Sequence, residues 1–157
     1  MGAHGGKELY TVGQGARIAG QPEPYFVVRR DRDCEDVFVA RGRDNPLLFS
    51  DRLYFKPGSL HWIVGAPPAH PAPEGGSGEE GRVRVRFKSR HNQGMDDGWL
   101  QIQGSSSGGG AVLSFDRPQR AITPGQVCAI YDPLGDVCLG GGVILSGDTT
   151  VRLQVGR

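Results

Sequence analysis

The sequence predicts a mainly β protein, and three observations support that class. Period-two alternation and short runs of β-branched or aromatic residues recur along the chain, whereas helical periodicity is almost absent. The 26 glycines and 11 prolines among 157 residues are typical of a chain with many turns. They concentrate at 65–81 and 104–110, where we expect long loops. Many short strands joined by turns favour a barrel or a sandwich.

Strands are predicted where apolar or β-branched runs are bounded by turn residues. In chain order they are 25–28, 37–40, 60–64, 83–90, 99–103, 111–115, 126–131, 139–145 and 151–155. Pro124-Gly125 predicts a type II turn, with glycine where φ must be positive, and 132–136 predicts a hairpin turn. A boundary is expected near Lys56-Pro57-Gly58, which gives domains at 1–56 and 57–157. Segment 65–81 is either a linker or, as we prefer, a loop within the second domain.

Composition limits the classes of function. A net charge of +1 gives no overall nucleic-acid signature, so any RNA affinity must come from a local patch. Three scattered cysteines without C-x-x-C predict neither disulfides nor zinc and favour a reducing compartment, and the four histidines lack metal-ligand spacing. No apolar run has the length of a membrane span. The N-terminus lacks a signal or transit pattern, and we expect the chain to be part of a longer protein.

The strongest physical signal is a strand of alternating cations at 82–90. Alternate side chains of a strand point to opposite faces, so five cations form one row while Val83, Val85 and Phe87 pack inward. The row comprises Arg82, Arg84, Arg86, Lys88 and Arg90. The row could bind an RNA backbone, or it could be a solvated strand face whose charges protect an edge against aggregation, and the sequence favours the two interpretations about equally. Repulsion among five like charges would be relieved by an anionic partner.

No catalytic constellation is predicted. The glycine-rich N-terminus lacks G-K-[ST] and a preceding buried strand, so it is not a nucleotide loop. Cys128 and Cys138 lie in apolar strands, where thiols are usually inert. Asp96-Asp97 is interpreted as a hairpin turn, and 140–142 as a bulge or a tight barrel corner. The larger aromatic residues are expected in the core rather than stacked on bases: Tyr25, Phe26, Trp62 and Trp99.

Five collinear motifs resemble the tRNA-specific 2-thiouridylase family across almost the whole chain. They are G-x-H-x-G-x-x-x-Y-T-V-G-Q at 2–14, P-Y-F-V-V at 24–28, D-N-P-L-L-F at 44–49, H-W-I at 61–63, and A-I-T-P-G-Q with C-L-G-G-G at 121–126 and 138–142. Ala16, Glu23-Pro24 and 36–40 look most similar to the mitochondrial members.

The resemblance implies a small β-rich central tRNA-binding domain followed by a six-stranded barrel similar to that of translation factors. It implies a sulfurtransferase that thiolates C2 of the wobble uridine of mitochondrial tRNAs. In that family a separate domain uses ATP with magnesium to adenylate the uridine, and cysteines there relay persulfide sulfur from a donor protein. Neither the S-G-G-x-D-S loop nor those cysteines occurs here. The chain alone is therefore expected to be inactive, to bind tRNA as a monomer, and to need no cofactor or metal of its own. Its expected location is the mitochondrion, or the cytoplasm for a bacterial protein.

The resemblance also assigns site residues. The R-[YF] tRNA contact falls on Arg86-Phe87, or in another register on Arg90-His91, and the T-P-G-Q contact falls on Gln126. Gly15 departs from the family, which has arginine there. Alternation points Phe87 inward, so its contact would need the backbone or a bulge. Two alternatives stay open: a stand-alone RNA- or protein-binding barrel without a catalytic partner, and a structural remnant that binds nothing.

Overall fold

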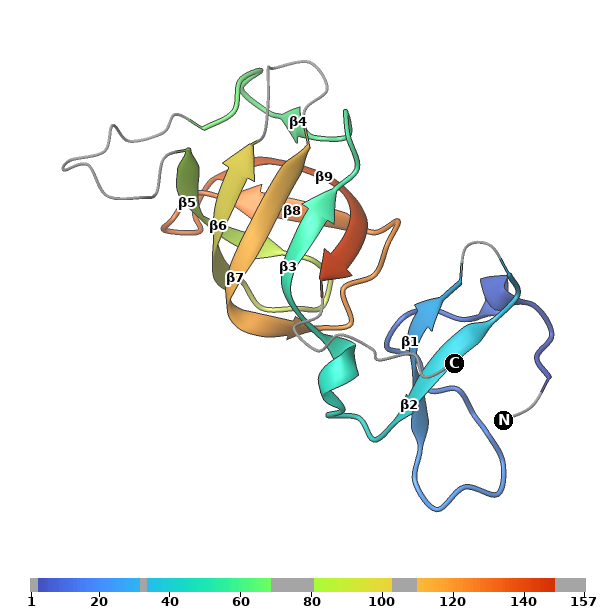
Figure 1. Ribbon diagram of the computed structural model, residues 1–157. Coiled ribbons are helices and arrows are strands. Elements are labelled where there is room, and N and C mark those ends of the chain that lie inside the picture. The colour runs from blue at the N-terminus through green and yellow to red at the C-terminus, as the bar shows by residue number, and fades with distance from the viewer. Residues whose placement is uncertain (1–2, 32–33, 69–80, 103–109, 149–157) are drawn as a thin grey trace.

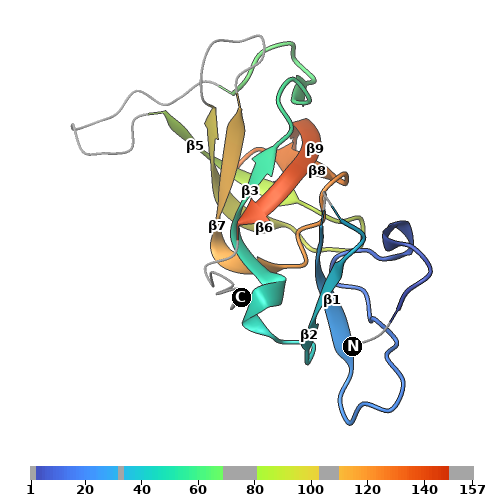
Figure 2. The same cartoon turned by 45° about the vertical axis from the view of Figure 1, so that its right-hand side comes forward.

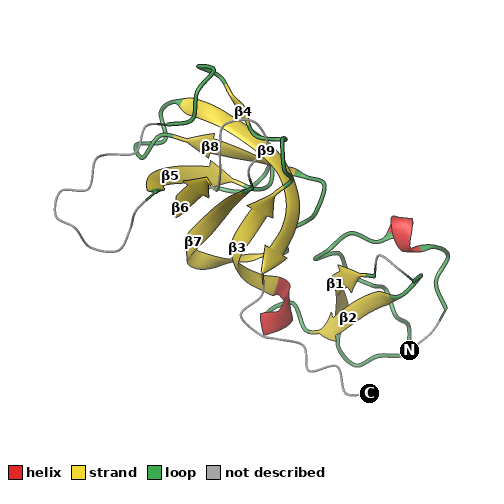
Figure 3. Ribbon diagram, turned by 45° about the horizontal axis from the view of Figure 1, so that its top comes forward, coloured by secondary structure: helices red, strands yellow, loops and turns green. Residues whose placement is uncertain are grey.

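The computed structural model describes residues 3–31, 34–68, 81–102 and 110–148. Strands dominate it, and Figure 3 shows the two short 3-10 helices, η1 (Lys7–Leu9) and η2 (Pro46–Leu48), among them. Neither helix of this described part is long and apolar enough to span a bilayer. Figure 1 shows two bodies, a small hairpin module and a barrel, joined through η2.

The module is built around one antiparallel hairpin, β1 (Tyr25–Arg30) and β2 (Val37–Arg41). Val27 is fully buried, and its backbone exchanges hydrogen bonds with Gly13 and Gln14, which lie in the preceding loop. Gly15 forms a further bridge to Phe26. The Y-T-V-G-Q segment therefore runs beside β1 as an extra edge of the module.

The barrel consists of six antiparallel strands in the order β3-β7-β6-β5-β8-β9, and pairing of β3 with β9 closes it. This is the predicted barrel class, with the predicted strand number. The strands are β3 (Phe49–Phe55), β5 (Arg82–Lys88), β6 (Asp96–Ile102), β7 (Ala111–Arg120), β8 (Val127–Tyr131) and β9 (Cys138–Asp148). A two-residue strand, β4 (His61–Trp62), pairs with the outer edge of β9.

The barrel interior is filled by inward side chains from every strand of the closed ring. Phe87 is fully buried, and its ring stacks on Phe115 with centroids 4.9 Å apart. The other core residues are Leu53, Phe55, Val83, Val85, Leu100, Ala111, Leu113, Ile122, Cys128, Ile130 and Ile144. On β3, β5, β7 and β8 their i, i+2 spacing is the alternation typical of strands with one face in a core.

The three consecutive glycines of β9 are explained by crowding. A Cβ on Gly141 would lie 2.7 Å from the carbonyl oxygen of Cys128, and one on Gly142 would lie 2.9 Å from the Phe55 ring. The β8–β9 register also shifts between Ile130 and Tyr131. The interpretation of this run as a bulge or a tight corner is confirmed.

Two expectations about strands were wrong, and the strand expected at 60–64 is reduced to the two residues of β4. Residues 49–55 were not expected to be a strand, yet β3 closes the barrel through β7 and β9. Asp96-Asp97 is not a turn but the beginning of β6, and the connection from β5 occupies the residues before it. The predicted strand at 151–155 and the central parts of both long loops lie outside the described residues.

The division into domains at 1–56 and 57–157 stays a prediction. The β3 strand precedes that boundary in sequence but pairs only within the barrel sheet. We therefore propose a boundary in the connection between β2 and β3, where η2 lies. Asn45 caps η2, because its side-chain oxygen accepts a hydrogen bond from the backbone N–H of Leu47 at 3.0 Å.

Candidate RNA interface

The cationic strand of the sequence is β5, and its alternation is as predicted. Val83, Val85 and Phe87 are buried in the barrel, while the cations between them lie on the outer face. Arg90 follows the end of the strand and is half-buried. The row therefore exists on the barrel surface, except that its last member leaves the strand.

The row is partly neutralised within the chain. Both terminal nitrogens of Arg84 donate to the carboxylate of Asp116 on β7, at 2.7 and 2.6 Å, and its guanidinium lies 5.1 Å from the Trp99 ring centroid. Arg86 lies 3.7 Å from Asp97 on β6 and donates to the carbonyl oxygen of Leu134 at 3.2 Å. Acids on the neighbouring strands β7 and β6 therefore supply a counter-charge to both arginines within the protein, so a bound anion is not needed to relieve their repulsion.

The Arg84–Asp116 pair also shifts the titration of its two members. The hydrogen bonds from Arg84 hold the pKa of Asp116 below its usual value, and those to Asp116 hold the pKa of Arg84 above its own. A guanidinium held in this way by a bidentate carboxylate is less available to a phosphate. The structure thus gives Arg84 a partner inside the protein.

Phe87 lies too deep to meet a ligand through its side chain. Its relative exposure is 0%, and the ring is covered by the barrel core. The β5 strand carries no bulge here, because Phe87 pairs regularly with Asp96 and Ile130. Phe87, which the family resemblance proposed as a tRNA contact, therefore sits in the barrel wall with its side chain in the core.

Three other predicted site residues gather at one end of the barrel. Lys88 pairs with Ala129 across antiparallel β5 and β8, so the end of β5 and the beginning of β8 lie side by side. Arg90 lies two residues beyond Lys88, and Gln126 lies three residues before Ala129. Gln126 is exposed, with its backbone held by hydrogen bonds to Thr123 and Ile144. The turn before it has the predicted positive φ at Gly125, 89°.

The same turn contacts the hairpin module. The hydroxyl of Thr123 lies 3.5 Å from the carbonyl oxygen of Val12 and donates to that of Ala121 at 3.0 Å. Gly13 lies directly against Ala121, with no room between them for a further methyl group. Two motifs that are about 110 residues apart in sequence, Y-T-V-G-Q and A-I-T-P-G-Q, are thus one structural contact.

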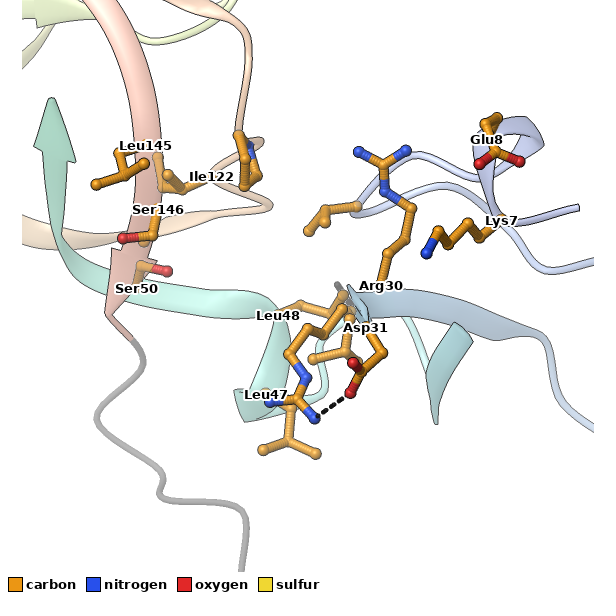
Figure 4. Close-up of a pocket in the computed structure, with 15 residues that line it drawn as sticks. Lys7, Glu8, Arg30, Asp31, Leu47, Leu48, Ser50, Ile122, Leu145 and Ser146 are labelled. Carbon is orange, nitrogen blue, oxygen red and sulfur yellow. Dashed lines mark ion pairs between the residues drawn. The ribbon is translucent and has the colours of Figure 1, made fainter. Parts of the chain in front are cut away.

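A cleft of about 650 Å³ lies between the module and this end of the barrel. Figure 4 shows Lys7, Glu8 and Arg30 on the module side, facing Ile122, Leu145 and Ser146 of the barrel. Figure 2 shows the module and barrel from a second side. Leu47 and Leu48 of η2 also line the cleft, so its lining combines apolar side chains with charged ones.

The module side of the cleft is rich in cations. Lys7 pairs with Glu35 at 3.3 Å, and Arg29 pairs with Asp31 at 3.7 Å. The side chain of Arg30 forms no ion pair or hydrogen bond with another described residue. Sequence reasoning missed Arg30, although Arg29-Arg30 at the end of a predicted strand was a visible signal.

The buried thiol of Cys128 is not activated as a nucleophile. Burial raises the pKa of Cys128 to about 12, and the residue has 0% relative exposure. This confirms the expectation of an inert core thiol for Cys128. Within the described ranges, no cluster of three metal-ligating side chains occurs.

Comparison with known proteins matches both parts of the chain. Residues 52–144 match the family described as the aminomethyltransferase beta-barrel domain, and residues 1–41 match the tRNA methyl transferase PRC-barrel domain. The mitochondrial tRNA-specific 2-thiouridylase 1 of Gallus gallus is 37% identical over 158 residues, covering 100% of this chain and 34% of the relative. The tRNA-specific 2-thiouridylase MnmA of Chromohalobacter salexigens is 37% identical, covering 93% and 35%. That of Lacticaseibacillus paracasei is 38% identical, covering 92% and 35%.

The chain spans about a third of the length of these relatives. The barrel match covers β5 to β8 and most of β3 and β9, and the second match covers the hairpin module. On these matches, the chain belongs to the tRNA-specific 2-thiouridylase family, whose C-terminal part it represents.

Proposed function

We propose that this chain is the tRNA-binding part of a tRNA 2-thiouridylase, in which the barrel and module hold the RNA while another part of the enzyme thiolates the wobble uridine. The observation that supports this most is the convergence of Lys88, Arg90 and Gln126 at one end of the barrel, where the end of β5 lies beside the beginning of β8. Phosphate contacts position an RNA, and RNA is recognised largely by shape.

The proposal ranks the predicted contact residues. Lys88 and Arg90 have no ion-pair partner among the described side chains and lie at the same end of the barrel as Gln126, so we propose them as phosphate contacts. Gln126 is an uncharged, exposed donor and acceptor on a rigid turn, suited to a base edge or a sugar hydroxyl. Arg84, Arg86 and Phe87 stabilise the barrel wall in this account, and any RNA contact at Arg86-Phe87 is secondary.

ATP and its magnesium, and the persulfide donor, are proposed to act on the part of the full-length enzyme outside this chain. The described residues do not fit a nucleotide: the glycine-rich segment leads into the three-residue helix η1, with no described strand before it. A phosphate loop needs a strand, a loop and a following helix. The mitochondrial relative that covers the whole chain supports a mitochondrial location.

The test is a salt titration of RNA affinity for three variants of the 157-residue chain. Lys88→Gln removes a proposed phosphate contact and should reduce the slope of log K against log salt by about 1. Gln126→Ala should weaken binding without changing the slope, because no charge is lost. Arg52→Gln is the matched control, since Arg52 is an exposed cation on β3 outside the proposed surface. Equal effects of Lys88→Gln and Arg52→Gln would contradict the assignment.

A further inference from the structure

Three guanidinium groups gather where the barrel meets the module, apart from the outer face of β5. Arg120 is the last residue of β7, Arg43 lies in the connection after β2, and Arg90 follows β5. The Nε of Arg120 donates to the carbonyl oxygen of Arg43 at 3.0 Å, and its guanidinium lies 5.3 Å from the centroid of the Phe26 ring. These contacts fix Arg120 between the two bodies.

The cluster has unsatisfied donors. The Nη2 of Arg120 and the Nε of Arg90 are both buried, and neither has a hydrogen-bond partner among the described residues. Leaving a buried donor unpaired costs about 1–3 kcal/mol, and more when the group is charged. Such groups are rare in folded proteins unless a ligand, an ion or a water completes them.

The charges of the cluster are also poorly balanced. Burial first, and then the nearby charges of Arg43 and Arg90, lower the pKa of Arg120. Of the charged groups that act on Arg120, only Asp44 is acidic. At Arg120, two guanidinium groups therefore act against one carboxylate, and such like-charge repulsion disfavours the charged form.

We propose that Arg43, Arg90 and Arg120 form a phosphate-binding site, and that it takes one phosphodiester group of the RNA. The inference rests on the proposed function and deepens it, because it names a contact at the junction rather than on β5. Guanidinium groups bind phosphate oxygens through paired, charge-assisted hydrogen bonds. A phosphate there satisfies the buried donors and offsets the repulsion in one step.

The site is placed to couple binding to the arrangement of the two bodies. Arg43 and the Phe26 ring belong to the module side, whereas Arg90 and Arg120 belong to the barrel. Gln119, beside Arg120, accepts a hydrogen bond of 2.6 Å from Gln93, which holds the loop that contains Arg90. An anion bound among the three arginines thus contacts both bodies.

Arg43→Gln tests the site cleanly. Arg43 is exposed, and it accepts the hydrogen bond from Arg120 through its backbone carbonyl, which the substitution keeps. In a chloride buffer we expect the melting temperature to rise on the order of 2 °C, because repulsion is relieved. In inorganic phosphate at equal ionic strength, the native chain should gain stability, and the variant should lose at least half of that gain. Its RNA affinity should fall about tenfold. Arg90→Gln should act in the same direction on both readouts.

Arg41→Gln is the matched control. It removes the same charge two residues away, from a side chain that is exposed and paired with Glu23 at 3.3 Å. We expect its phosphate response to be native and its RNA affinity to change by less than about twofold.

The outcomes separate this site from the proposed function. If Lys88→Gln and Gln126→Ala weaken RNA binding while Arg43→Gln does not, the arginine site is wrong and the proposed function stands. A phosphate response that Arg43→Gln abolishes without loss of RNA affinity identifies a site for free phosphate and overturns the RNA assignment. A lower melting temperature of Arg43→Gln in chloride would also overturn the proposal, since the cluster would then be structural.

Discussion

Gly13 of the module packs directly against Ala121 of the barrel, and both residues have positive φ, 84° and 56°. A Cβ at residue 13 would overlap the Cβ of Ala121. The backbone N–H of Ala121 donates to the carbonyl oxygen of Leu48 at 2.7 Å, which fixes it against the η2 connection. At this point the two bodies therefore meet closely, with the backbone of residue 13 against the Ala121 side chain, and a residue larger than glycine has no room there.

Gly13→Ala should separate the two bodies or strain their contact. Positive φ costs an alanine about 1–2 kcal/mol, and overpacking adds about 1–3 kcal/mol. The control is Gly20→Ala, because Gly20 also has positive φ, 74°, but no atom within 4 Å of the added Cβ. The free energy of unfolding, from urea titration, should fall more for Gly13→Ala than for Gly20→Ala. Equal losses would show that the close contact contributes nothing.

The Arg84–Asp116 pair should contribute modestly to stability. Both side chains are partly exposed, 36% and 39%, so we expect a coupling of about 0.2–1 kcal/mol from a double-mutant cycle with Arg84→Gln and Asp116→Asn. Zero coupling would mean that the bidentate geometry has no energetic effect.

The same pair predicts a pH dependence. The folded-state pKa of Asp116 is lowered, so its contribution is complete above the unfolded value near 3.8 and is lost as the pH falls through the folded value. Asp116→Asn should therefore remove part of the stability that the native chain loses below about pH 4. The check is the free energy of unfolding from urea titration at pH 3 and pH 6. If the native chain and Asp116→Asn lose the same free energy between pH 6 and pH 3, the lowered pKa of Asp116 is contradicted.

The cysteines should differ sharply in alkylation. Burial raises the pKa of Cys128 to about 12, whereas Cys34 is exposed. Iodoacetamide at pH 8 should label Cys34 in the folded chain and Cys128 only in denaturant, as peptide mass spectrometry can resolve. Labelling of both at similar rates would mean that the barrel opens readily.

Asn45→Ala should weaken the connection between the bodies. Loss of an N-cap costs about 0.5–2 kcal/mol, and here the lost bond is the one from the Leu47 N–H. Asn45→Asp keeps the accepting oxygen and should unfold at nearly the native urea concentration. If Asn45→Asp loses as much stability as Asn45→Ala, the effect comes instead from the hydrogen bond that the Asn45 side-chain N–H donates to the Arg41 carbonyl.

The sequence predicts most of the strands because burial in a barrel imposes alternation on local sequence. Val83, Val85 and Phe87 show this pattern plainly. The β3 strand was missed because Asp51 and Arg52 interrupt its apolar run and its register shifts between Ser50 and Arg52. The i, i+2 pair Leu53 and Phe55 was the available signal.

The site was harder to predict than the fold. The family motifs proposed Gln126 and Arg90 as candidates, but the neutralisation of Arg84 depends on Asp116, 32 residues away on another strand. Arg43 and Arg120 have no local pattern that distinguishes them from solvated arginines. Their meeting is a product of the chain's tertiary path, which single-sequence periodicity does not encode.

The central claim is that this chain recognises tRNA, and one measurement tests it most directly. The affinity of the chain is titrated with salt for a tRNA that carries a wobble uridine and for an unrelated hairpin RNA of the same length. We predict preference for the tRNA, with a salt slope that corresponds to several phosphate contacts. Weak and equal binding to both RNAs would contradict the claim and favour a stand-alone barrel without a role in tRNA recognition.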